Sequence, residues 1–169
     1  MIETRNVKIS LKTSSISLNN ASVCLDTANI NHKCYNNFIT FKSEFAFVLF
    51  KPSKNNINHI NVSRLKTKQD IEQSVSIIKK VFAVKVISAK VDNIVATTNL
   101  NRKLDLCRIV KANIFKKAKY NPEQFPGLFV GLTKGSAILF HSGKTVIVGC
   151  KRNKDVRWVV KEIIATLKT

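Results

Sequence analysis

The sequence predicts an α+β fold in which two similar halves share one antiparallel sheet, with the helices packed on one side. Three observations predict this class. Short strands rich in β-branched and aromatic residues are separated by turns, several of which contain glycine. Between them lie segments whose apolar residues recur at helical spacing. The order of elements is similar in the two halves of the chain, which indicates an internal repeat.

The first half contains four predicted strands and one clear helix. The strands are NVKISLK (Asn6–Lys12), NNFITFK, EFAFVLFK and HINVSRL. A helix is predicted from about Thr67, and its apolar face consists of Ile71, Val75, Ile78 and Phe82. The segment Thr13–Asn37 is rich in Asn and Ser and shows no helical face, so only the repeat predicts a helix there.

The second half has stronger patterns. The strand KVDNIVATTN (Lys90–Asn99) precedes a helix whose apolar face is Leu106, Ile109, Val110 and Ile114. The connector YNPEQFPG (Tyr120–Gly127) leads into three strands, LFVGLTK, SAILFHS and TVIVGCK, which are expected to form an antiparallel meander. Asn153 is the expected N-cap of a last helix. The apolar positions of that helix are Val156, Val159, Val160, Ile163, Ile164 and Leu167.

Matching positions support the repeat. The matched pairs are Asn6 and Asn93, Phe38 and Phe125, Phe50 and Phe140, and Val62 and Val148. Their separations differ only slightly, as expected if length changes fall in turns. Each half is therefore predicted to consist of a strand, a helix, three strands and a helix, and the chain is predicted to divide into residues 1–84 and 85–169.

The charge of the chain indicates a polyanionic partner. The formal net charge is +19, with 13 basic and 5 acidic residues up to Lys85 and 16 and 5 beyond it. The charge therefore belongs to the folded body and not to a tail, which favours nucleic acid as the ligand. The beginning, MIETRNVKIS, has no apolar signal-peptide core, so we expect a soluble intracellular protein.

Few side chains suit catalysis or metal binding. The four cysteines form no C-x-x-C pair, and the three histidines lack metal-ligand spacing around them. No paired carboxylates or glycine-rich phosphate loop are found, and ten acidic residues would hardly supply a two-metal nuclease site. We therefore expect no enzyme activity, no cofactor and no metal.

Some strands are apolar on both faces. TVIVGCK and FAFVLFK are examples, yet at most four helices are predicted and they can cover only one face of a sheet. An antiparallel sheet normally turns a polar face to water. A second apolar face bordered by Lys and Arg predicts a binding surface.

The motifs of the second half resemble a known family. NIVATTNLNRKLDL, followed by YNPEQFPGL, ILFHSGK and GCK, resembles a repeat of the TATA-box-binding protein core. The resemblance covers Val91–Thr169 through these motifs and Thr4–Phe82 through the repeat. It implies a saddle of two quasi-symmetric repeats, in which a curved ten-stranded sheet carries helices on its convex face. It also implies a transcription initiation factor whose concave face binds and bends the minor groove of A·T-rich promoter DNA.

The resemblance implies which residues contact DNA. Phe125 and Phe140, with the repeat-mates Phe38 and Phe50, would wedge into base steps, whereas Phe45, Phe47 and Phe82 are expected in the core. Asn93 and Val95, with Asn6, would lie at the floor of the groove. The rest of an apolar floor would be Ile138, Val146, Val148, Ile60 and Val62. The expected phosphate contacts are Lys144, Lys151, Lys54, Lys42 and Lys134.

Several departures from the family pattern predict an altered promoter preference. Val62 and Val148 stand where the family usually has Thr, and Lys8, also expected to face DNA, stands where it has Val. The loop containing Glu123 resembles the stirrup that a transcription factor IIB-type partner grips, so that partner and the polymerase machinery are expected. The expected location is the nucleus or, for a virus-encoded factor, the site of viral transcription.

Two alternatives remain at this stage. A relative could keep the saddle without TATA selectivity and act through protein partners. The chain could also be a substrate-binding domain of a nucleic-acid enzyme, since similar saddles occur in such enzymes.

Overall fold

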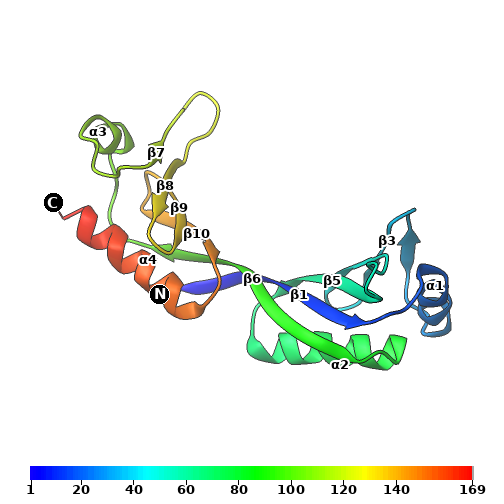
Figure 1. The fold of residues 1–169 in the computed structure, drawn as a ribbon. Helices are drawn as coiled ribbons and strands as arrows, with labels where there is room; N and C mark the ends of the chain where they lie inside the picture. The colour runs from blue at the N-terminus through cyan, green and yellow to red at the C-terminus, as the bar shows by residue number, and fades with distance from the viewer. Residues whose placement is uncertain (169) are drawn as a thin grey trace. The chain divides into compact units, whose positions relative to one another are not determined.

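The structure, a computed structural model, describes residues 1–168. The N-terminal part contains β1 (Glu3–Ser14), α1 (Leu18–Thr27), β2 (His32–Cys34), β3 (Phe38–Lys42), β4 (Ala46–Phe50), β5 (Ile57–Leu65) and α2 (Lys68–Phe82). The C-terminal part contains β6 (Val86–Asn99), α3 (Leu106–Lys111), β7 (Ala118–Lys119), β8 (Leu128–Leu132), β9 (Gly135–Leu139), β10 (Lys144–Cys150) and α4 (Asn153–Thr166) (Figure 1).

The chain forms two compact units. The N-terminal unit is Asn6–Asp92, and the C-terminal unit combines Met1–Arg5 with Asn93–Thr169. In the N-terminal unit the strand order is β2-β3-β4-β5-β1, and in the C-terminal unit it is β6-β10-β9-β8-β7. The strand pairs within each unit are antiparallel. These units divide the chain by compactness, whereas the predicted division at residue 84 follows the repeat.

Alternate residues of the N-terminal strands are buried against α1 and α2. The buried strand residues are Val7, Ile9, Leu11, Ile39, Phe41, Phe47, Leu49, Ile60, Val62 and Leu65. Ala21 and Leu25 of α1 and Ile78 and Phe82 of α2 complete this core. The Phe41 ring stacks on Phe47 at a centroid distance of 4.6 Å and meets the Phe82 ring edge-on at 5.6 Å. Phe45, Phe47 and Phe82 are buried, as predicted.

The C-terminal core follows the same arrangement. Ile94, Ala96, Ile147, Cys150, Ala137, Leu139, Leu128 and Val130 are buried on one face of the sheet. Val156, Val159 and Ile163 of α4 are buried against that face, and α4 contacts β9 and β10. Helices therefore cover one face of the sheet in each unit, and we call the other face the open face of that unit.

The strand register aligns the two units residue by residue. Ile9 pairs with Val62 and Ser10 with Asn61, while Ala96 pairs with Ile147 and Thr97 with Val146. In both units the register shifts between the Ile9 or Ala96 pair and the next, which is Val7 with Leu65 in one unit and Ile94 with Cys150 in the other. Ser10 therefore corresponds to Thr97, and Asn61 corresponds to Val146.

The structure differs from the sequence prediction at several elements. The segment without a recognisable apolar face contains α1, which begins after an N-cap in which the Ser17 hydroxyl accepts a hydrogen bond from Asn20 N–H. Each unit has an additional short edge strand, β2 or β7. Asn153 is the first residue of α4 and not its N-cap. The cap position is Arg152, whose side chain makes no capping hydrogen bond.

Arg152 and Asp155 fix the start of α4. The Arg152 guanidinium donates to the Asp155 carboxylate at 2.9 Å from Nε and 3.0 Å from Nη2. This hydrogen bonding lowers the pKa of Asp155 below its ordinary value of 3.8, although desolvation opposes the shift. A carboxyl group with a depressed folded-state pKa stabilises the fold above its unfolded pKa, and the contribution is lost as the pH falls through the folded-state pKa.

The first prediction concerns this ion pair. We expect Arg152→Gln to lower the free energy of unfolding near neutral pH, and we expect the difference from the wild type to shrink as the pH falls through the depressed folded-state pKa of Asp155. Urea unfolding across this range measures the difference. Arg157→Gln removes an exposed charge from the same helix and should follow the wild type in parallel. A difference for Arg152→Gln that stays constant down to the lowest pH would contradict the assignment.

Candidate nucleic-acid interface

The open face of the C-terminal unit is largely apolar. Its residues alternate with the buried core residues along each strand and are partly or fully exposed. They are Val95, Thr97, Val146, Val148, Ile138 and Phe129. Thr97, Val146, Ile138 and Phe129 follow one another across β6, β10, β9 and β8 as directly paired neighbours. The predicted floor residues of this unit therefore lie together.

Three aromatic rings cluster at one end of this face. Phe125 lies 6.0 Å from Phe140 and 5.3 Å from Phe129 between ring centroids. Phe125 and Phe129 are 38% and 46% exposed, which is unusual for Phe in a folded unit. Sequence reasoning predicted Phe125 and Phe140 but missed Phe129. The alternation of Leu128, Phe129 and Val130 would have placed that ring on the open face.

Gly127 makes room for the Phe125 ring. A Cβ atom at Gly127 would lie 2.5 Å from Phe125 Cε1, 2.6 Å from Ile138 Cγ2 and 3.2 Å from Phe140 Cε1. The backbone N–H of Phe125 donates to the Asn121 carbonyl at 2.9 Å, which closes the turn before the ring. The ring is thus carried by the connector and lies over Gly127, which has no side chain and directly precedes β8.

The N-terminal unit has a similar ring pair, but the two rings are attached at different backbone positions. Phe38 and Phe50 are direct partners across β3 and β4, and their centroids are 6.1 Å apart. By register, Phe38 corresponds to Gly127 and not to Phe125, so the predicted repeat-mates occupy different backbone positions. Tyr35 stacks on Phe38 at 4.5 Å and gives this unit a third ring, which sequence reasoning missed because the flanking segment shows no pattern.

Asn6 and Asn93 occupy equivalent positions in the two units. The Asn6 side-chain oxygen accepts a hydrogen bond from Arg64 N–H at 2.8 Å, and the Asn93 oxygen accepts one from Gly149 N–H at 2.7 Å. Arg64 and Gly149 both have positive φ, of 71° and 81°. Because the backbone engages each oxygen, the amide of each Asn is oriented with its NH₂ group left to donate to a ligand.

The predicted floor of the N-terminal unit must be corrected. Ile60 and Val62 are fully buried in the core, because they have the same parity as the inward-facing residues of β5. The open-face residues of β5 are Asn61 and Ser63. The strand pairing shows the error: Val148 corresponds to Ser63, one position beyond the Val62 that sequence matching had paired with it.

The open face of the N-terminal unit is consequently polar. Its residues are Lys8, Ser10, Asn61, Ser63, Val48 and Thr40, which correspond in order to Val95, Thr97, Val146, Val148, Ile138 and Phe129. Three valines of one unit are thus replaced by a lysine, an asparagine and a serine in the other. The two halves have similar folds but present different chemistry.

Basic residues border both open faces. Lys42, Lys54, Lys134, Lys144 and Lys151 are all exposed, but they lie at strand ends and turns and do not form one cluster in sequence. The C-terminal unit also has a hollow of about 400 Å³ beside Phe129 and Ser136, lined by Lys116, Lys117 and Lys119. Sequence reasoning did not assign these three lysines, which add positive charge at the edge of the open face.

The connector between β7 and β8 projects away from its strands (Figure 1). Glu123 lies in this connector and is exposed. It shares the segment with Phe125, which belongs to the ring cluster. The connector thus joins the predicted partner-binding residue to the open face of the same unit.

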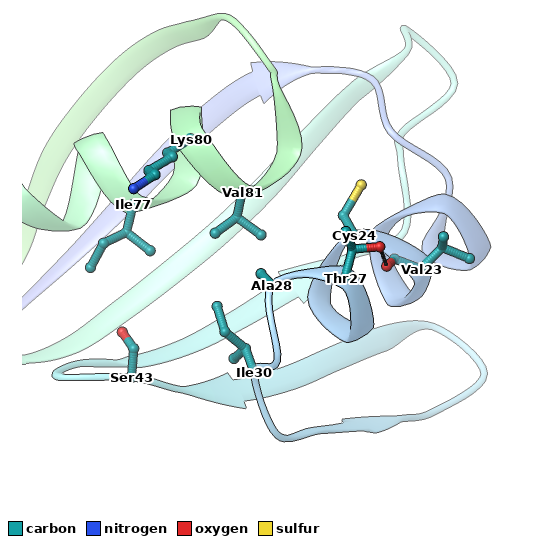
Figure 2. A pocket seen from close by; sticks show the side chains of 9 residues that line it. All are labelled: Val23, Cys24, Thr27, Ala28, Ile30, Ser43, Ile77, Lys80 and Val81. Atoms are coloured by element: carbon teal, nitrogen blue, oxygen red, sulfur yellow. Dashed lines mark hydrogen bonds between the residues drawn. The ribbon is translucent and has the colours of Figure 1, made fainter.

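A separate groove lies on the helix side of the N-terminal unit. It has a volume of about 600 Å³ and is mostly apolar. Figure 2 shows Ile77 and Val81 of α2 opposite Ala28 and Ile30, which follow α1. The lining contains none of the predicted DNA-contacting residues, so this groove is distinct from the open face.

Other kinds of site find little support among residues 1–168. No group of three or more His, Cys, Asp and Glu side chains that could hold a metal ion is found in that range. All four cysteines are free thiols, and only Cys150 is buried. Within the same range, no helix is both long and apolar enough to cross a membrane.

Comparisons with known proteins show what this chain is similar to. Residues 88–169 match the family described as transcription factor TFIID (or TATA-binding protein, TBP). The chain is 43% identical over 83 residues to the TATA-box-binding protein of Pyrobaculum neutrophilum, covering 48% of this chain and 41% of that protein. It is 40% identical over 81 residues to that of Archaeoglobus fulgidus, covering 47% and 43%. The matched segment therefore spans about two fifths of these relatives.

The fold extends the similarity to the whole chain. The solved structure of Methanococcus jannaschii TBP matches 99% of this chain and 98% of its own, with a TM-score of 0.83 and 28% identity. The predicted α+β class and its two-repeat TBP fold are thereby confirmed. Residues 88–169 thus match the TATA-binding protein family, and the chain as a whole has the TBP fold.

The second prediction concerns Gly127. We expect Gly127→Ala to displace the Phe125 ring, because the new Cβ cannot share space with the ring or with the β-branched Ile138 side chain. Nuclear Overhauser effects between the Phe125 and Phe140 rings should be present in the wild type and absent in the variant. Gly131→Ala is the control, because its new Cβ would lie 3.1 Å from Lys117 Cβ and would contact none of the aromatic rings. Unchanged ring contacts in Gly127→Ala would refute the packing argument.

Proposed function

We propose that the protein is a TATA-box-binding transcription initiation factor that binds and bends double-stranded DNA through the minor groove. The observation that carries this proposal is the pair of partly exposed aromatic rings in each unit, with centroids 6.1 and 6.0 Å apart, beside an open sheet face. The match of residues 88–169 to the family supports it, as do the names of the relatives. The formal charge of +19 supplies attraction to phosphates.

The rings act as wedges. A flat apolar ring that enters an opened base step replaces part of the lost stacking, and the bent duplex then contacts more protein surface. Opening a step costs a few kcal/mol, so the wedge must be held where it meets the step without further rearrangement. Phe38 and Phe50 are held by the β3–β4 ladder, and Phe125 is held over Gly127 beside Phe140.

The apolar open face of the C-terminal unit selects A·T pairs. The minor groove of A·T pairs presents only acceptors, whereas G·C adds the guanine amino donor. Val95, Val146 and Val148 give that donor no partner, so burying it there is costly. Because Gly149 N–H engages its oxygen, Asn93 can turn its NH₂ group to the adenine N3 or thymine O2 acceptors.

The projecting connector is the proposed contact for a second protein. Its exposed Glu123 would bind a basic surface on a transcription factor IIB-like partner that brings the polymerase machinery to the bent DNA. We place this activity in the nucleus or, for a virus-encoded factor, at the site of viral transcription. No enzymatic step is needed for this role, and we propose none.

The third prediction tests bending. A short TATA duplex labelled with a fluorophore at each end should show increased energy transfer when the wild type binds, because the ends approach. The Phe125→Ala/Phe140→Ala variant should bind more weakly and bend the duplex much less, because only the Phe38 and Phe50 pair remains to wedge. Trp158→Ala is the matched control, since Trp158 is 56% exposed on α4, and it should bend the duplex like the wild type. Salt-sensitive binding by the wild type without any bend would refute wedging and favour a relative that acts through other ligands or protein partners.

The fourth prediction concerns salt. If the five predicted lysines contact phosphates, the slope of log K against log salt should be about −4.5, which corresponds to roughly a 500-fold loss of affinity between about 50 and 200 mM. Lys144→Gln/Lys151→Gln should reduce the slope by about two. Lys79→Gln/Lys80→Gln removes two exposed charges from α2 and should leave the slope unchanged. Equal effects of both pairs would mean that the charge acts without defined contacts.

A further inference from the structure

The hydrogen bonding on the two open faces runs in opposite directions. In the C-terminal unit the Thr97 hydroxyl oxygen accepts from Arg5 Nε at 3.0 Å, so an arginine donor lies beside the valines. In the N-terminal unit the equivalent Ser10 hydroxyl donates to Asp92 at 3.1 Å. The Ser10 proton is thus directed to Asp92, and its oxygen lone pairs remain available as acceptors.

Asn61 lies next to Ser10 and has an uncommitted amide. It pairs with Ser10 across β1 and β5 and with Val48 across β4 and β5, so it occupies the middle of the open face. Among residues 1–168, no hydrogen bond to the Asn61 side chain is found, whereas the Asn6 oxygen is engaged by Arg64 N–H. Asn61 can therefore accept from a ligand through its oxygen and donate through its nitrogen.

These acceptors match one feature of the minor groove. Guanine is the base that presents a donor there, its N2 amino group, and an apolar face disfavours it because the amino group loses its hydrogen bonds to water. Ser10 and Asn61 offer two adjacent acceptors at positions where the other unit has Thr97, already engaged by Arg5, and Val146. The open face of the C-terminal unit disfavours guanine, whereas the open face of the N-terminal unit can accept a hydrogen bond from the guanine amino group.

We propose that the N-terminal unit recognises a half-site that contains a G·C pair, with the Asn61 side-chain oxygen accepting from the guanine amino group. The C-terminal unit recognises the A·T half. This inference rests on the proposed DNA-binding function and specifies its substrate. The unlike faces then make the preferred site asymmetric, with a guanine in one half only.

Inosine isolates the proposed contact, because it pairs with cytosine and lacks only the N2 amino group of guanine. A set of A·T duplexes carries one G·C or one I·C pair at each position in turn, and fluorescence anisotropy gives Kd for each. For the wild type, one position in one half should bind G·C about three- to tenfold more tightly than I·C, the worth of one hydrogen bond. Positions in the other half should bind I·C more tightly than G·C.

Variants identify the residue responsible. Asn61→Val should abolish the preference for guanine over inosine, and Asn61→Asp should keep it, since the acceptor remains, while weakening binding to every duplex. Val146→Asn is the matched variant of the C-terminal unit and should create the preference in the other half. Thermal unfolding of each variant confirms that it is folded.

The outcomes separate this proposal from the one on which it rests. Specific binding to the A·T duplex, with I·C favoured over G·C at every position, would overturn the proposed guanine contact and leave the TATA-box function intact. A preference for guanine that survives Asn61→Val would overturn the role of Asn61. Failure of the wild type to prefer any A·T duplex over mixed-sequence DNA would overturn both.

Discussion

In each unit, an asparagine side chain accepts a hydrogen bond from the backbone where the strand register shifts. This shift determines which residues lie on each face of the sheet. The Asn6 and Asn93 oxygens accept from the N–H groups of Arg64 and Gly149, whose positive φ accommodates an additional residue in the strand. Because side chains alternate with a period of two, one additional residue changes which side chains of the strand face the helices. The shift therefore determines both which residues enter the core and which residues lie on the open face.

The alternation accounts for what the sequence could reveal. Strands, amphipathic helices and their order follow from local periodicity, and the C-terminal motifs identified Phe125, Phe140 and the valines, which do lie together on one face. The floor of the N-terminal unit could not be predicted in this way. Matching Val62 to Val148 compares residue types along the chain, whereas the register makes Ser63 the equivalent of Val148. An error of one residue exchanges core and surface.

Other features had no local signal. The helix α1 buries only Ala21 and Leu25 and owes its start to the Ser17 cap, so its apolar pattern is too sparse to distinguish it from a loop. Tyr35 joins the ring cluster only through tertiary contact with Phe38. The sequence shows that Ser10 and Asn61 are polar. Their place on the open face follows only from the strand pairing, and the direction of the Ser10 hydrogen bond follows from the position of Asp92.

The two ring pairs differ in how their positions are fixed. Phe38 is a strand residue whose backbone is already ordered by its ladder, whereas Phe125 belongs to a connector whose ordering costs conformational entropy of its own. The N-terminal pair is consequently the more preorganised of the two. A molecule that binds the projecting connector also restricts Phe125. Such binding would therefore lower the entropic cost of ordering the C-terminal ring pair. Occupancy of the connector and insertion of the ring are thus thermodynamically linked.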